Sequence, residues 1–192
     1  MFIDYLTIML INLVAGFFLL AYYVYSGIDD TDQRAWAPGF GVVGIIGVAT
    51  GLHMIFTWPL PSSFNIAFGE TELLFGALFL LASLALAFNT SLYTVAIYAI
   101  FAGVAAIVIG ARIIDRGVTT QPIVSGIGFI LSGLTAILFL PIAYWVPSRP
   151  AKIIFAIIAI IAALIWAFIG YTAYWEHLSS FANWAPATLR GR

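Results

Sequence analysis

Residues 53–76, HMIFTWPLPSSFNIAFGETELLFG, place a turn with two prolines between two long apolar runs. Pro59 and Pro61 end the first run as a helix, because proline lacks a backbone N–H and its ring keeps the preceding residue out of helical geometry. Each flanking run has about 20 residues, the length that crosses a bilayer as a helix. The stretch therefore predicts two membrane helices joined by a rigid turn at the membrane surface.

The composition of the whole chain indicates that lipid is its solvent. Of the 192 residues, 64% are hydrophobic and 8% are charged, whereas a soluble domain has about 25% charged residues. The mean hydropathy is +1.11. In lipid, only helices and closed barrels satisfy the backbone hydrogen bonds. The apolar runs are continuous rather than alternating, which predicts an all-α integral membrane bundle and not a barrel.

Six apolar runs predict six transmembrane helices in a single domain that covers residues 1–192. Short loops make neighbouring helices antiparallel, and an even number of spans places both chain ends on one side. Asp4 stands where a cleavable signal would carry positive charge, so we interpret the first run as a permanent span. The tail from Glu176 onward is too polar and too short to span. The predicted spans are residues 3–25, 39–58, 66–88, 92–114, 122–144 and 153–175.

Several classes of protein are excluded or disfavoured by what the sequence lacks. The absence of cysteine excludes disulfides, iron–sulfur clusters and thiolate metal sites. A net charge of −1 argues against a nucleic-acid partner. The sequence motifs of serine hydrolases, phosphate loops and zinc proteases are also absent. We therefore expect neither an enzyme nor a metal site.

The basic residues favour one orientation by a small margin. The side of the chain ends carries one more basic residue than the other side, and cytoplasmic loops are the more basic ones. We therefore expect a multi-pass protein of the cell membrane with both termini in the cytoplasm. The residues compared are Arg112, Arg116, Arg190 and Arg192 on the side of the chain ends, and Arg34, Arg149 and Lys152 on the other.

Both histidines and all three glutamates fall in the half of the bundle that carries the chain ends. His53 would lie about 7–8 Å below that surface, where an ionisable side chain is costly. Three interpretations stay open. The imidazole is neutral and bonds a backbone carbonyl, Thr50 or Thr57; or it lines a polar path or senses protons; or it ligates a metal or haem together with His177.

Glu70 and Glu72 begin the third predicted span. Carboxylates at a helix N-terminus are stabilised by about 0.3–1 kcal/mol through the helix dipole, and this is the interpretation we favour for Glu72. Glu70 is the better candidate of the two to face inward, where Arg112 or Arg116 could neutralise it. Asn65 is placed to cap the same helix.

Small residues recur at helical spacing in three spans, which permits close contact between helix backbones in lipid. We expect these faces to pack inside the bundle, with a subunit interface as the alternative. Asn12, inside the first span, either bonds across helices or lines a path. The three faces consist of Gly44, Gly47 and Gly51; of Gly103, Ala106 and Gly110; and of Gly128, Ser132 and Ala136.

Five segments carry a family resemblance: FIDYLTIMLINLVAG (2–16), TGLHMIFTWPLPSSFNIAFGE (50–70), YAIFAG (98–103), ARIIDRG (111–117) and AYWEHLSSFANWAP (173–186). Through them the chain resembles a family of uncharacterised prokaryotic integral membrane proteins, a domain of unknown function. That resemblance covers nearly all spans but implies no activity.

A second resemblance is shorter. The segments LLFGALFLLASLALAF (73–88) and YTVAIYAIFAGVAAIV (93–108) are similar to the urea and short-amide channel family. This resemblance implies six spans, a ring-shaped oligomer and a pore in each subunit. The glutamate that this family carries in its last span has no equivalent here, since Glu176 lies beyond the predicted span.

We therefore expect a channel or carrier for a small polar solute such as an amide or weak acid, gated by protonation and assembled as a homo-oligomer. Phe75 would form an apolar constriction, and no cofactor would be needed. The alternatives are a redox subunit that binds quinone or haem b through His53 and His177, and a structural accessory subunit of a membrane complex. The candidate pocket residues are Asn12, His53, Trp58, Asn65, Glu70, Glu72, Phe75, Arg112 and His177.

Overall fold

The computed structural model describes residues 5–61 and 63–184, and the described chain is helical without strands. All six helices are long and apolar enough to cross a membrane, which confirms the predicted all-α bundle of six spans. Short π-helical turns follow α1 (Tyr23–Gly27) and α5 (Pro141–Trp145), another precedes α3 (Asn65–Glu70), and a 3₁₀ turn, Arg34–Trp36, precedes α2. The helices are α1 (Leu6–Tyr22), α2 (Ala37–Thr57), α3 (Thr71–Ala87), α4 (Tyr93–Arg116), α5 (Pro122–Leu140) and α6 (Arg149–Ser180).

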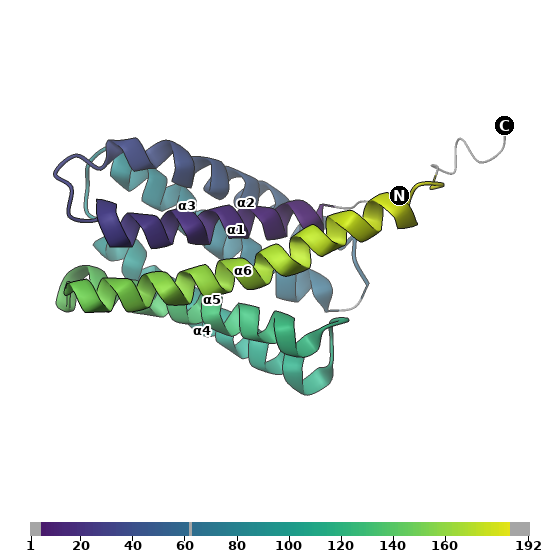
Figure 1. The fold of residues 1–192 in the computed structure, drawn as a ribbon. Coiled ribbons are helices and arrows are strands. Elements are labelled where there is room, and N and C mark those ends of the chain that lie inside the picture. Colours follow the sequence, from purple (N-terminus) through teal and green to yellow (C-terminus); the bar gives the residue numbers. More distant parts are fainter. Residues whose placement is uncertain (1–4, 62, 185–192) are drawn as a thin grey trace.

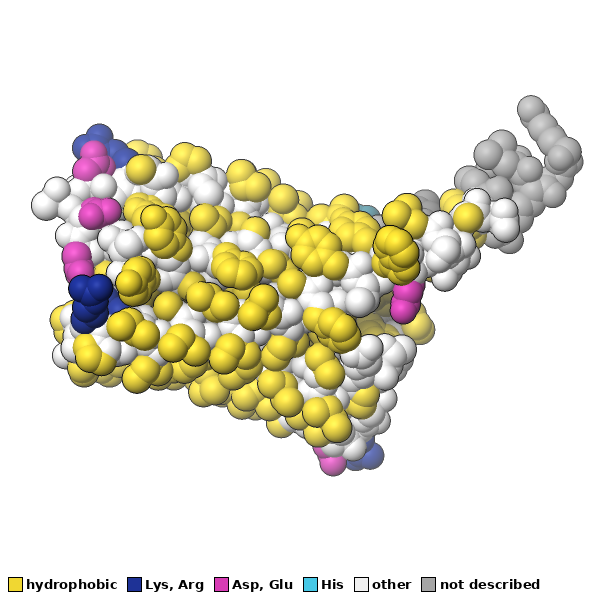
Figure 2. Space-filling view, viewed as in Figure 1, with side chains coloured by type: hydrophobic (Ala, Val, Ile, Leu, Met, Phe, Trp, Pro, Cys, Tyr) yellow, Lys and Arg dark blue, Asp and Glu magenta, His cyan; other side chains and the backbone are white. Residues whose placement is uncertain are grey.

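The bundle has two distinct ends. The start of α1, the end of α6 and the α2–α3 and α4–α5 connections lie together at what we call the terminal end (Figure 1). The other three connections form the loop end. Apolar side chains cover the visible flank of the bundle, and charged side chains gather at its two ends (Figure 2). This distribution fits a multi-pass protein surrounded by lipid.

The last helix is longer than the sequence predicts. Its 32 residues correspond to about 48 Å, against about 30 Å for the hydrocarbon core of a bilayer. It projects past its neighbours at the terminal end (Figure 1). Glu176 is therefore part of α6 and not of a tail, because a helix satisfies its own backbone and needs no lipid to continue.

Glycine brings α2 and α3 into backbone contact. A Cβ added to Gly44 would lie 2.4 Å from the backbone nitrogen of Leu80, and one added to Gly51 would lie 2.6 Å from that of Leu73. Gly47 faces Gly76, and a Cβ added to Gly47 would lie 2.8 Å from the Cα of Gly76. The predicted small face of this span therefore packs inside the bundle.

The α4–α5 pair is built in the same way. Gly103 and Gly110 of α4 meet the backbone oxygens of Gly133 and Gly126. Gly128, on the predicted small face of α5, packs closely against α6, where a Cβ would be 3.1 Å from the ring of Trp166. The predicted small faces of α4 and α5 therefore pack inside the bundle, and α5 packs closely on two sides.

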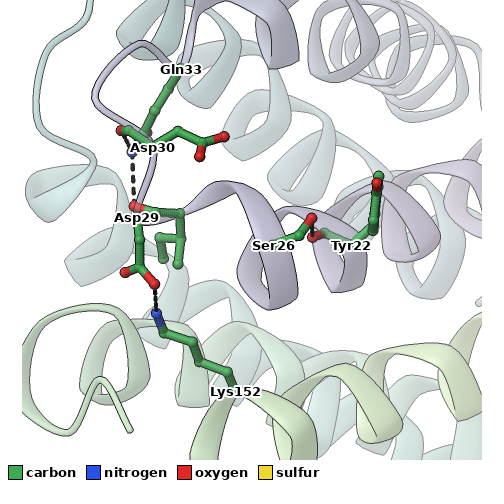
Figure 3. A network of polar contacts seen from close by, with 7 residues as sticks. Tyr22, Ser26, Asp29, Asp30, Gln33 and Lys152 are labelled. Atoms are coloured by element: carbon green, nitrogen blue, oxygen red, sulfur yellow. Dashed lines mark hydrogen bonds and ion pairs between the residues drawn. The ribbon is translucent and has the colours of Figure 1, made fainter. Parts of the chain in front are cut away.

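An ion pair ties the loop end together. Lys152, near the start of α6, has a side chain that is only 8% exposed, and its Nζ donates to the carboxylate of Asp29 in the α1–α2 connection (Figure 3). Gln33 closes the same connection by donating to the backbone oxygens of Ile28 and Asp30. The Lys152–Asp29 pair therefore joins the α1–α2 connection to α6 at the loop end.

Candidate functional site

A cavity of about 460 Å³ lies at the terminal end, and we call it the mouth cavity. Helical spacing places Thr172 and Glu176 on the face of α6 that lines it, one turn apart. Thr119 and Gln121 from the α4–α5 connection, and the start of α1, form other parts of its wall. The rim of the mouth cavity is therefore polar.

The inner wall of the mouth cavity is the indole of Trp166, which is 1% exposed. Its Nε1–H donates to the hydroxyl of Ser132 at 2.9 Å, and that hydroxyl donates to the backbone oxygen of Gly128 at 2.8 Å. Phe129 packs edge-on against the same ring at 5.1 Å between centroids. The indole is thus held in place by α5 from two directions.

Behind Trp166 lies the carboxyl cavity, about 10 Å³ in volume and lined by Glu72, Thr71 and Ser132 among others. This volume is close to the minimum that holds one water. Glu72 is 3% exposed, and its Oε1 lies 3.4 Å from the side-chain nitrogen of Asn12. The same nitrogen donates to the backbone oxygen of Val43 at 2.9 Å. Asn12 therefore bonds across helices and also lies beside the carboxyl.

Phe75 separates the carboxyl cavity from a third one, the aromatic cavity, of about 60 Å³. Tyr23 lines the aromatic cavity near the loop end, and its hydroxyl donates to Gln33 Oε1 at 2.6 Å. Apart from that tyrosine the walls are apolar, and the rings among them are Phe17, Phe40, Phe75, Phe79 and Phe139.

The three cavities form a row along the bundle. Trp166 is a wall of both the mouth and the carboxyl cavity, and Phe75 is a wall of both the carboxyl and the aromatic cavity. The row begins among polar groups at the terminal end and finishes at Tyr23. Trp166 and Phe75 are therefore the two aromatic side chains that lie between neighbouring cavities.

The structure reverses our expectation for the two glutamates. Glu70 is exposed and Glu72 is buried, so the inward-facing carboxyl is the one we assigned to the helix dipole. The helical segment begins at Asn65, which puts Glu72 two turns inside it and beyond the reach of the terminal dipole. Arg112 pairs with Asp115 at the terminal end, not with a glutamate.

Asn65 does not cap the third span, and that prediction is wrong. Its side chain instead accepts a hydrogen bond from Leu60 N–H at 3.0 Å and donates to Leu60 O at 2.5 Å. Two reciprocal bonds close the proline turn, and they account for the complete burial of this amide. Trp58 lies at the start of the turn with φ +47° and is half exposed, away from the row of cavities.

The two histidines lie in different surroundings. His53 is exposed, and its Nδ1 lies 3.2 Å from the Tyr5 hydroxyl and 3.4 Å from Thr57 Oγ1. Loss of solvent raises the pKa of Tyr5, and its hydrogen bond with Thr57 opposes that rise. His177 lines the mouth cavity. The haem alternative stays a prediction, and an absorbance spectrum of the purified protein tests it.

Sequence reasoning missed Trp166 and the role of Ser132. A signal was available, because tryptophan concentrates at membrane interfaces while this one stands in the middle of its span. A buried indole N–H needs an acceptor, so a tryptophan at that depth predicts a polar partner on a neighbouring helix.

No curated protein and no solved structure matches the chain significantly. Residues 1–180 match a family described as protein of unknown function (DUF981). This match agrees with the resemblance to an uncharacterised family that the five sequence segments indicate. Since it covers nearly the whole chain, the protein belongs to the DUF981 family of proteins of unknown function.

Proposed function

We propose that this protein is a carrier or gated channel that moves a small polar solute of the amide or weak-acid class across a membrane. The observation that carries this proposal is the row of three cavities joined at Trp166 and Phe75. Membrane pores select by diameter, by the hydrogen-bonding groups that line them and by electrostatic barriers, and the row offers each of these.

The walls favour a solute that is neutral while it crosses. The aromatic cavity offers few polar groups, so an ion there would lose its hydration without compensation. A small amide, or a weak acid in its protonated form, loses much less. Glu72 and Ser132 line the carboxyl cavity and supply hydrogen-bonding groups before that apolar step, and Asn12 lies beside the carboxyl.

The test is solute uptake into liposomes that contain the purified protein. Urea, acetamide and acetate are offered in turn, and the rates are compared with those of protein-free liposomes. Phe75→Ala removes the wall between two cavities and is expected to speed the passage of the accepted solute. Phe88→Ala, an exposed position near the end of α3, is the matched control and should leave the rate unchanged. If none of these solutes passes above background at any pH, the proposal is abandoned.

The proposal includes a homo-oligomer in the cell membrane with cytoplasmic termini. The orientation rests on the four basic residues that the sequence places on the side of the chain ends, against three on the other side. Because the chain has no cysteine, Thr90→Cys and Thr120→Cys provide matched probes for the two ends. An impermeant maleimide applied to intact cells should label Thr90→Cys alone, and the reverse pattern would overturn the orientation. Chemical cross-linking in membranes tests the oligomer.

A further inference from the structure

Glu72 is an ionisable side chain enclosed within a membrane bundle. It lies seven residues after Asn65, where its span begins, which corresponds to a depth of about 10 Å. Its side chain is almost completely buried. Ionisable groups in such positions are costly, and they commonly belong to ion pathways or proton relays.

The surroundings of Glu72 offer no opposite charge. Asn12 presents a neutral amide from α1, and Gly47 of α2 has no side chain, so that a Cβ there would lie 3.2 Å from Glu72 Oε1. From α5 and α6 the cavity walls are Phe129, Ser132 and Trp166. None of the ion pairs formed among residues 5–61 and 63–184 includes Glu72.

Titratable groups do occur on the far side of Trp166. Glu176 and His177 line the mouth cavity and lie nearer the surface. The indole therefore stands between the buried carboxyl and the groups that exchange protons with water. The carboxyl cavity has room for about one water, which is enough to pass a proton inward when the indole moves.

Resting on the proposed transport function, we propose that Glu72 is a proton-binding site whose loading and unloading is coupled to the passage of the solute. The carboxylate takes a proton from water in the mouth cavity and becomes a neutral carboxylic acid. In the closed bundle the neutral acid leaves no uncompensated charge beside Asn12. When the row opens toward the loop end, the proton leaves to water on that side together with the solute, and the carboxylate is left free to bind the next proton from the mouth cavity.

The first arm of the test uses infrared spectroscopy of the protein in liposomes and does not depend on transport. A protonated carboxylic acid has a carbonyl band distinct from the carboxylate bands. We expect such a band at neutral pH in wild type and in Glu70→Gln, and its loss in Glu72→Gln. Labelling the three glutamates with ¹³C should shift the same band in the wild-type protein, which covers the case in which Glu72→Gln does not fold. An unshifted band, or none at neutral pH, would overturn the proposal.

The second arm measures protons and solute together in liposomes loaded with a pH-sensitive dye. An imposed solute gradient should change the internal pH in wild type and in Glu70→Gln, and this proton movement should be lost in Glu72→Gln. Equal proton movement in Glu72→Gln and wild type would overturn the coupling while leaving transport intact. A Glu72 carboxylic acid band in a protein that passes no solute would instead overturn the transport function and support the proton-binding site.

Discussion

The α2–α3 pair and the centre of the bundle are packed in opposite ways. In the pair, glycines let two backbones touch, so that a Cβ at Gly76 would lie 2.6 Å from Val48 N. At the centre, the ring of Phe75 packs against Phe17 and the indole of Trp166 against Phe129, and the row of cavities lies beside these rings. Lipid supplies no hydrophobic drive for helix association, so rigidity comes from close backbone contact. The difference indicates that the α2–α3 and α4–α5 pairs are stiff. Side chains at the row of cavities between them, which we call the seam, have room to move.

The largest effect is expected where the backbones touch. Gly76→Ala would place its Cβ against backbone atoms of α2 that cannot move without separating the helices, and we expect a loss of about 3 kcal/mol in the free energy of unfolding. Gly39→Ala is the matched control, because its Cβ would meet only the flexible end of Leu19 at 3.2 Å. Unfolding by denaturing detergent measures both variants. Equal stability of the two would show that backbone contact does not hold the pair.

A smaller loss is expected at the loop end, where Lys152 pairs with Asp29. Asp29→Asn removes the carboxylate that faces the buried ammonium. Asp29 itself is largely exposed, so we expect about 1–2 kcal/mol rather than the full cost of breaking a buried pair. Asp32→Asn breaks the exposed pair with Arg34 and should leave the stability nearly unchanged, because water screens an exposed pair. A larger loss in Asp32→Asn than in Asp29→Asn would contradict this ranking.

Next comes the indole that closes the mouth cavity. Trp166→Phe keeps an aromatic ring but removes the N–H that bonds Ser132, which we expect to lower stability by about 1 kcal/mol and to speed solute passage. Trp175→Phe alters an indole on the same helix that is 83% exposed, and it should change neither property. Unchanged solute passage in Trp166→Phe would mean that this hydrogen bond does not keep the seam closed.

The smallest effect should come from a hydrogen bond within the stiff pair. Ser83 Oγ donates to the backbone oxygen of Ala37 at 2.7 Å, from α3 to α2. Hydrogen bonds between membrane helices contribute about 0.6 kcal/mol on average, so Ser83→Ala should cost far less than Gly76→Ala. Thr50→Ala, which loses a bond within its own helix, provides the comparison. A loss in Ser83→Ala as large as in Gly76→Ala would mean that polar contacts, not close packing, stabilise the pair.

Some of the site was within reach of the sequence. Glu72 and Gly76 are one helical turn apart and therefore share a face of α3. Because Gly76 packs against α2, the side chain of Glu72 on the same face also points toward α2. Glu70 lies two residues earlier, about 200° around the helix, and faces outward. We expected Glu70 to face inward, whereas the spacing to Gly76 indicates Glu72.

Asn12 and Trp166 show where sequence reasoning ends. Asn12 meets Val43, 31 positions away, and Glu72, 60 positions away. Trp166 meets Ser132, 34 positions away. The sequence around each of these residues does not predict its hydrogen-bonding partner, because the partner depends on how each helix is rotated in the bundle.

The sequence by itself determined the number of crossings, the helical class and the end of the bundle at which both histidines and all the glutamates gather. A backbone in lipid must bond within its own segment, so length and composition suffice for those conclusions. Only the tertiary structure decided that Glu72 and Trp166 face the interior while His53 and Glu70 face outward. The rotation of a helix is set by its contacts with other helices, and in this bundle glycines on α2 and α5 set it.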